Sequence, residues 1–245
     1  MTLAALLALG ATIGALLGLL GAGGSILAVP GFIAVLGLPM SGASLAGAMV
    51  VGSAAAASLL RRRASESIHV RAGVTFSATG LIGTILGARL TSIVDDRLIT
   101  YLFALVVLAA AVSMWRPVNL ASKTRSGAIA MFVIASGVGV LTGLFGIGGG
   151  FMIVPALVLG MGLTVREASG ASLVAITMNS VIALLLRADE WSAIQPVPVA
   201  IVGVVAIATS VVVAPLASRI PAPTLRRGFA LFLVGVALLL IADTL

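Results

Sequence analysis

The sequence contains no cysteine and a single histidine, His69. Without cysteine the chain can form no disulfide, no thiolate nucleophile and no cysteine-ligated metal site, and one histidine is too few for a histidine metal cluster. Charged residues are also scarce, at 9% of the chain compared with about 25% in soluble domains. We therefore expect no bound metal and no other cofactor, and we do not expect a soluble domain.

Apolar residues make up 61% of the 245 residues, and the mean hydropathy is +1.29. Because one membrane crossing takes about 20 apolar residues, the chain can form roughly eight to ten crossings. The net charge of +7 raises the alternative of a nucleic-acid partner. The charged residues all lie between apolar runs, however, so we expect no nucleic-acid binding. The sequence predicts an all-α integral membrane protein that crosses the cell (inner) membrane several times.

Eight long apolar segments, bounded by charged residues, glycine or proline, predict transmembrane helices. They cover residues 2–20, 42–60, 70–90, 98–115, 127–145, 166–187, 193–217 and 224–243. Two further apolar segments, 25–37 and 151–162, would each span only roughly 18 Å as helices, less than the ~30 Å hydrocarbon core. We expect these two to be short broken or re-entrant helices. The predicted fold class is therefore a polytopic helical bundle with eight long spans and two short helices.

Lysine and arginine are concentrated in three of the loops, and basic loops stay on the cytoplasmic side of a membrane. These loops surround residues 61–71, 116–125 and 219–227. With all three inside, corresponding segments of the two halves run in opposite directions, which predicts two inverted repeats. The whole chain, 1–245, then forms a single membrane domain with repeat one at 1–116, a cytoplasmic linker at 117–125 and repeat two at 126–245.

A shift of 125 residues superimposes two glycine-rich segments and supports this duplication. GLLGAGGSILAVPGFIAVLGL at 18–38 aligns with GLFGIGGGFMIVPALVLGMGL at 143–163. The matched positions include Gly14 with Gly139, Gly23 with Gly148, Gly24 with Gly149, Pro30 with Pro155, and Gly37 with Gly162. Beyond Ser44 and Ser169 the sequence alone does not fix the register. Inverted halves with glycine- and proline-interrupted helices at corresponding positions are the arrangement expected of secondary transporters.

The clustered glycines predict breaks in membrane helices. An unpaired backbone N–H inside hydrocarbon costs several kcal/mol, so such a break is tolerated only where protein, water or substrate satisfies the freed groups. Amides at the N-terminal end of a helix also attract anions. The predicted substrate-binding residues at the two breaks are Gly23, Gly24 and Ser25, and Gly148, Gly149 and Gly150, with Pro30 and Pro155 as hinges.

The alternative is that the glycines only permit tight helix crossings. Gly10, Gly14 and Gly18 are spaced four residues apart, as small residues are at packed membrane-helix interfaces. We prefer the packing interpretation for these spaced glycines and the binding interpretation for the clustered ones.

The second copy, GLFGIGGGFMIVPALVLGMGLTVREASGASL at 143–173, resembles the signature of the sulfite exporter TauE/SafE family, and residues 18–45 resemble a weaker version of it. The resemblance extends along the chain in length, two-half layout and motif position. It implies membrane transport of sulfite, sulfonates or related organosulfur anions, and this substrate class comes from the family alone. The first copy departs from the fuller motif, with Ala22 before the glycine pair and Ser25 in place of the third glycine.

Ser172 and Asn179 are further candidate substrate-binding residues. They lie seven residues apart in segment 166–187, nearly on one helical face. They line an anion path or else form hydrogen bonds between helices, which are common in membranes. We expect Arg61 to Arg63 to anchor the topology and contact anionic lipid. Arg187 is expected to reach the membrane interface, with a place in an anion entrance as the alternative.

Together these patterns predict a secondary transporter that moves a small sulfur-containing oxyanion by alternating access, with membrane lipid as its other partner and with an undefined oligomeric state. Two alternatives remain open: a passive anion channel with the same site, and a structural or signalling membrane subunit that transports nothing. We expect no enzymatic activity, because the sequence offers no nucleophile and base pair and no set of metal ligands.

Overall fold

The computed structural model describes residues 2–63, 68–90, 128–145, 150–188 and 194–244, together with positions 101–102, 105, 108–109, 111–112 and 191. All the regular elements in these residues are α-helices. In chain order they are α1 (Leu3–Leu20), α2 (Gly24–Leu36), α3 (Met40–Arg63), α4 (Val70–Leu90), α6 (Ala128–Phe145), α7 (Gly150–Met161), α8 (Val165–Leu186), α9 (Pro196–Arg219) and α10 (Ala222–Thr244).

The helices coincide with the predicted apolar segments. The two short helices α2 and α7 cover the two short segments, so their short length is confirmed, whereas a re-entrant course through the membrane stays a prediction. Helices also cover seven of the eight long segments, whereas most of the eighth, 98–115, and the linker at 117–125 lie outside the described residues. Five described helices, α1, α3, α4, α8 and α9, contain a stretch long and apolar enough to cross a membrane. The chain is thus a multi-pass α-helical protein, and the full set of eight long spans stays a prediction.

Three glycines in the left-handed backbone region end helices or begin turns. Gly21 has φ 72° and follows α1, and its N–H donates to the Leu17 carbonyl. Gly37 and Gly162 have φ 63° and 64°, and they follow α2 and α7. Because L side chains disfavour this region, glycine is the residue that allows each chain reversal. The matched pair at 37 and 162 explains why the sequence repeat extends to these positions.

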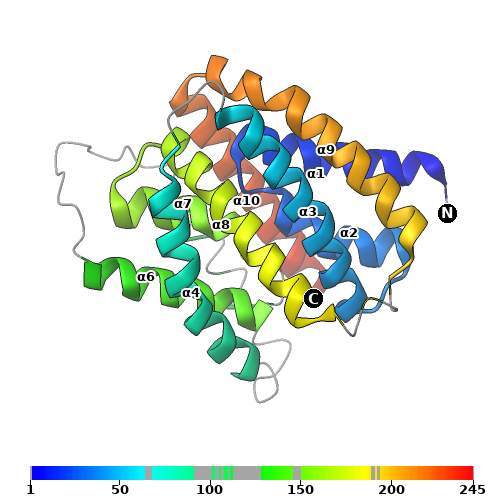
Figure 1. Ribbon diagram of the computed structural model, residues 1–245, viewed down its shortest axis with the longest axis horizontal. Coiled ribbons are helices and arrows are strands. Elements are labelled where there is room, and N and C mark those ends of the chain that lie inside the picture. Colours follow the sequence, from blue (N-terminus) through cyan, green and yellow to red (C-terminus); the bar gives the residue numbers. More distant parts are fainter. Residues whose placement is uncertain are drawn as a thin grey trace.

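Helices from the two halves of the chain pack against each other (Figure 1). The helices α3 and α8 lie side by side at the centre, α1 packs along α9 on one flank, and α4 packs along α6 on the other. Shifting the bounds of α1 by 125 residues gives those of α6. Each flank therefore joins the first long helix of one half to a later helix of the other half.

Rows of small residues allow these flanking helices to approach closely. A Cβ atom added at Gly10 would lie 2.7 Å from the Val202 carbonyl oxygen, and one at Gly18 would lie 2.8 Å from that of Ser210. On the other flank, an added Cβ at Gly139 would collide with the backbone of Gly80. The packing interpretation of the spaced glycines is therefore confirmed.

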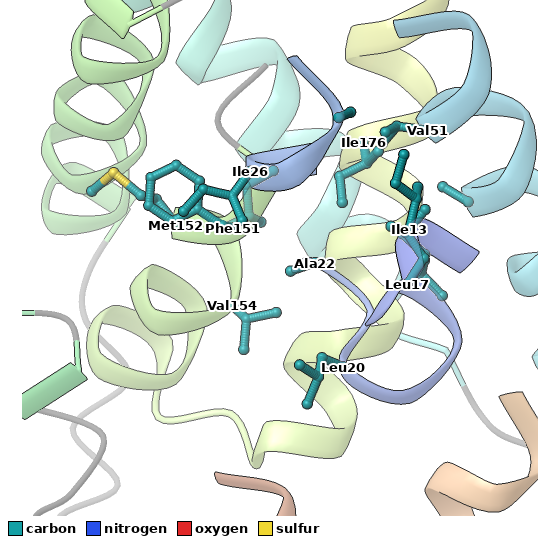
Figure 2. Close-up of a cluster of buried hydrophobic side chains, with 14 of the residues drawn as sticks. Ile13, Leu17, Leu20, Ala22, Ile26, Val51, Phe151, Met152, Val154 and Ile176 are labelled. Carbon is teal, nitrogen blue, oxygen red and sulfur yellow. The ribbon is translucent and has the colours of Figure 1, made fainter. Parts of the chain in front are cut away.

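A buried apolar cluster fills the space where α1, α2, α3, α7 and α8 meet (Figure 2). Ile13 and Leu17 of α1 are fully buried, and Phe151 at the start of α7 is 1% exposed. The outer faces are also apolar, with Leu185 and Val197 largely exposed. Such exposed side chains are expected where lipid replaces water as the surrounding medium.

Candidate functional site

A partly open cavity of about 350 Å³ lies among α2, α3, α4, α6 and α8. Its volume is in the range of small-molecule pockets, which is about 300–1,000 Å³. Most of its lining is apolar, but five hydroxyl groups are distributed around it, from Ser25, Ser44, Thr84, Thr142 and Ser180. The cavity occupies the end of the α3–α8 pair where α3 begins and α8 ends.

Asn179 of α8 lines this cavity, as does the neighbouring Ser180. The Ser77 hydroxyl of α4 donates a hydrogen bond to the Asn179 Oδ1 atom. That contact fixes the amide oxygen as an acceptor toward α4 and leaves the two NH₂ donors for a ligand. Asn179 thus lines a cavity and also forms the predicted interhelical hydrogen bond, while its place on an anion path stays a prediction.

Arg187 follows α8 and brings a positive charge to the cavity lining. Its guanidinium donates to the Ser44 hydroxyl at 3.3 Å and to the Ser41 carbonyl at 3.0 Å. Its side chain thus turns toward α3 and lines the cavity, which fits the predicted alternative of a place in an anion entrance, and its position relative to the membrane interface stays a prediction. The sequence feature that indicated a role in the cavity was the position of Arg187 at the end of α8, a helix that also carries the polar residue Asn179.

The first residues of α2 and α7 meet beside the cavity. Ser25 is the second residue of α2, and its hydroxyl donates to the Ala22 carbonyl at 3.1 Å. A Cβ atom on Gly150, the first residue of α7, would lie 2.7 Å from the Ser25 Oγ atom. Ser25 and Gly150, which the repeat matches to each other, thus lie side by side, while Gly148 and Gly149 lie outside the described residues.

Other candidate residues lie away from the cavity. Gly24 packs against Ile13 and Leu17, and Gly23 has Phe232 as its nearest neighbour in space. Neither Gly23 nor Gly24 is a lining residue. The two predicted hinges, Pro30 and Pro155, lie inside α2 and α7, so neither proline ends its helix.

Ser172 belongs to a second polar cluster near the N-terminal end of α8. It is fully buried, and its hydroxyl lies 2.6 Å from the Gly21 carbonyl oxygen and 2.8 Å from that of Ser169. The spacing of seven residues to Asn179 gave a shared helical face, but it also separates the two side chains by about 10 Å along the axis. Asn179 therefore lies at the open cavity, whereas Ser172 lies in the buried polar cluster.

Arg62 of α3 completes this second cluster and is only 3% exposed. Its guanidinium donates to the Ser169 hydroxyl at 3.1 Å and to the Gly18 carbonyl at 2.6 Å. Gly18 lies in the last turn of α1, where carbonyl groups lack helical partners and the helix dipole is negative. The predicted contact of Arg62 with lipid is therefore wrong, because its side chain is buried, while its part in setting the topology stays a prediction.

A second, larger depression of about 620 Å³ lies between α3 and α9 and is almost entirely apolar. Its one hydroxyl, that of Ser53, donates to the Val50 carbonyl within α3. It has no cationic group to recognise an anion. The cavity beside Asn179 and Arg187 is accordingly the candidate site.

The chemistry of this cavity suits noncovalent binding of a small anion. It combines one guanidinium, one amide and several hydroxyl groups with apolar walls, which is a typical composition for a ligand site. The hydroxyls of Ser25, Thr84 and Thr142 donate to backbone carbonyls within their own chain segments in this structure. Among the described residues no group of three or more His, Asp or Glu side chains could hold a metal ion. His69 lies elsewhere, exposed and 4.0 Å from Glu167.

Similarity to known proteins extends over most of the chain. A model of the sulfite exporter TauE/SafE family matches residues 6–240. Two proteins of Xylella fastidiosa, from strains 9a5c and Temecula1 / ATCC 700964, are each 33% identical over 174 residues, which is 68% of this chain and 67% of theirs. Each is named a probable membrane transporter protein. No solved structure shows a significant match.

Proposed function

The chain belongs to the sulfite exporter TauE/SafE family, and on this premise we propose that it is a secondary transporter of small sulfur-containing oxyanions such as sulfite or a sulfonate. Membership of this family makes it a multi-pass membrane transporter. The substrate class, the binding site and the mechanism are the parts that we propose.

The observation that carries the proposal is the cavity between the helices of the two halves. A sulfur oxyanion has three oxygen acceptors and at least one negative charge, so it needs several donors and a cation. The Arg187 guanidinium, the Asn179 amide and the hydroxyls of Ser25 and Ser180 belong to one cavity lining. We assign these four groups to the substrate, with the Ser25 hydroxyl turning from the Ala22 carbonyl to the anion when it binds.

The starts of α2 and α7 add a second source of attraction. The amides at a helix N-terminus carry partial positive charge and favour anions. Ser25 belongs to the first turn of α2 and lines the cavity, and Gly150 begins α7 directly beside it. In this proposal the amides from Gly23 to Ser25 and from Gly148 to Gly150 strengthen the field on the bound anion, while Pro30 and Pro155 are the hinges.

Two inverted repeats and alternating access complete the proposal. The 125-residue relation between α1 and α6 and the exchange of packing partners between halves support the duplication. The basic loop that follows α3 is assigned to the cytoplasm, so the cavity faces outward. The buried Arg62 cluster at the other end of the α3–α8 pair supports a carrier with one closed side over a continuous channel.

Flux into proteoliposomes tests this function. We expect saturable uptake of labelled sulfite or of an organosulfonate, with counterflow, and no uptake of a cation of similar size. Flux that does not saturate would indicate a channel, and absence of anion flux by folded protein would refute the transport proposal.

A matched pair of arginine variants tests the assigned site. Arg187→Gln removes the cavity cation, so we expect at least about a tenfold rise in KM, since hydrogen bonds to charged groups contribute about 1.5–3 kcal/mol. Arg89→Gln makes the same charge change at the exposed end of α4, outside the cavity lining, and should leave KM unchanged. Equal effects of the two changes would contradict the assignment.

A further inference from the structure

Arg62 and Arg187 make reciprocal contacts across the two halves of the chain. Arg62 of α3 donates to Ser169 of α8, and Arg187 after α8 donates to Ser44 of α3. A shift of 125 residues converts one pair into the other, from 44 to 169 and from 62 to 187. The 125-residue register of the repeat therefore continues beyond Ser44 and Ser169, where the sequence alone did not fix it. The two contacts join α3 and α8 at both ends of the helix pair.

The same shift relates the lining of the open cavity to a set of buried residues. Five lining residues, Ser44, Gly47, Gly143, Ala183 and Arg187, correspond to Ser169, Ser172, Gly18, Ser58 and Arg62. All five counterparts are buried. The region that would be a cavity at the opposite end of the α3–α8 pair is therefore closed, and its polar groups are retained inside it.

The buried set also contains a hydroxyl group without a hydrogen-bond partner among the described residues, that of Ser58. Ser58 is fully buried and lies one turn before Arg62. An unsatisfied buried hydroxyl destabilises a folded protein, so it is unexpected in a region that serves only packing. A hydroxyl that faces a ligand in another conformation accounts for it.

We propose that Arg62, Ser58, Ser169 and Ser172 form a second anion-binding mouth, closed in this structure, which opens when the outward cavity closes. This inference rests on the proposed transport function. Opening would separate the start of α8 and the end of α1 from α3. An oxyanion would then replace the Gly18 carbonyl and the Ser169 hydroxyl as the partner of Arg62, as a charged acceptor binds a guanidinium more strongly than a neutral one.

The structure thereby gives the two arginines equivalent roles at different stages of transport. Arg187 meets the anion on the open side, and Arg62 meets it on the other side after the conformational change. With Arg62 bound to Ser169 and Gly18, the closed side is held shut until an anion competes for the guanidinium. Arg62 is accordingly a substrate-contacting residue of the opposite state as well as a link between helices in this one.

Single-cysteine labelling tests the proposal directly, because the natural chain contains no cysteine. Ser58→Cys and Ala183→Cys are matched positions, 125 residues apart, in the closed and open mouths. In lipid nanodiscs, where both faces are accessible to a polar maleimide, we expect rapid labelling at 183 and slow labelling at 58. Saturating sulfonate should raise the rate at 58 and lower the rate at 183.

The Arg62→Gln variant provides a second test in the same labelling experiment. Removing the guanidinium should raise labelling at 58 by roughly tenfold and reduce it at 183, which corresponds to a shift of about 1.4 kcal/mol between the two states. Arg61→Gln, the exposed neighbour with the same charge change, should alter neither rate. Arg62→Lys should restore part of the closed state.

The outcomes separate this inference from the function on which it rests. If labelling at 58 stays slow with Arg62→Gln and with sulfonate while wild-type protein transports, the second mouth is refuted and the transporter stands. If labelling rises at both positions together, Arg62 only stabilises the fold, and the inference fails. If wild-type protein transports no anion, the proposed function fails, and the inference falls with it even if the Arg62→Gln rates change reciprocally.

Discussion

Replacing Asn179 by alanine should weaken anion binding far more than it weakens the fold. The Asn179 Oδ1 atom accepts a hydrogen bond from the Ser77 hydroxyl, so the side chain can contribute its NH₂ group as a donor to the cavity. A hydrogen bond to a charged partner contributes about 1.5–3 kcal/mol, which corresponds to about a 10- to 150-fold rise in Kd. The lost contact to Ser77 should lower the free energy of unfolding by only about 0.6 kcal/mol, the average for such bonds between membrane helices.

Isothermal titration of purified protein with an organosulfonate measures this effect, and thermal unfolding of the same sample measures stability. Ser77→Ala is the matched control, because it removes the same interhelical hydrogen bond while leaving the amide donors in place. Asn179→Asp should abolish binding, since it replaces donors by acceptors and adds a negative charge. Equal Kd values for Asn179→Ala and Ser77→Ala would show that Asn179 only links helices, and the reasoning would be refuted.

Two further predictions concern packing and topology. An added Cβ at Gly24 would lie 2.7 Å from the Ile13 carbonyl oxygen, whereas at Gly23 the nearest atom is 3.4 Å away, so Gly24→Ala should lower stability by about 1–3 kcal/mol and Gly23→Ala by much less. Thermal unfolding of the two variants tests this, and similar melting temperatures would contradict it. For topology, His69→Cys and Ala188→Cys should react with an impermeant reagent from opposite sides of intact vesicles. Reaction from the same side would exclude inverted repeats as we propose them.

The helix boundaries could be predicted because apolar segments in this chain end at charges, glycine or proline. The short segment 25–37 became α2 at Gly24–Leu36, and its end is fixed by the left-handed Gly37. The start of α8 lies one residue before that of the predicted segment 166–187. Thr164 and Glu167 form a capping box there, in which the Thr164 hydroxyl accepts the Glu167 N–H and the Glu167 carboxylate accepts the Thr164 N–H.

The roles of the arginines could not be predicted in the same way. A membrane helix that is apolar on all sides gives no periodic signal for which face is buried, so a charge near its end is expected to reach the interface. The burial of Arg62 results from α1 and α8, which lie far away in the sequence. Likewise, the contact of Arg187 with Ser44 depends on how α3 and α8 pair, and the spacing of residues within one segment carries no information about it.

The packing of α1 against α9 also determines the time between the synthesis of α1 and the synthesis of its packing partner. Roughly 175 residues separate the end of α1 from the start of α9. At about 5–20 residues per second, the ribosome needs roughly 10–35 s to produce that partner. During this interval the glycine row of α1 faces lipid or other segments, so α1 reaches its final place only after a much later part of the chain has been made. The contacts between α1 and α9 therefore form later than those between α4 and α6, which join the two halves without α9.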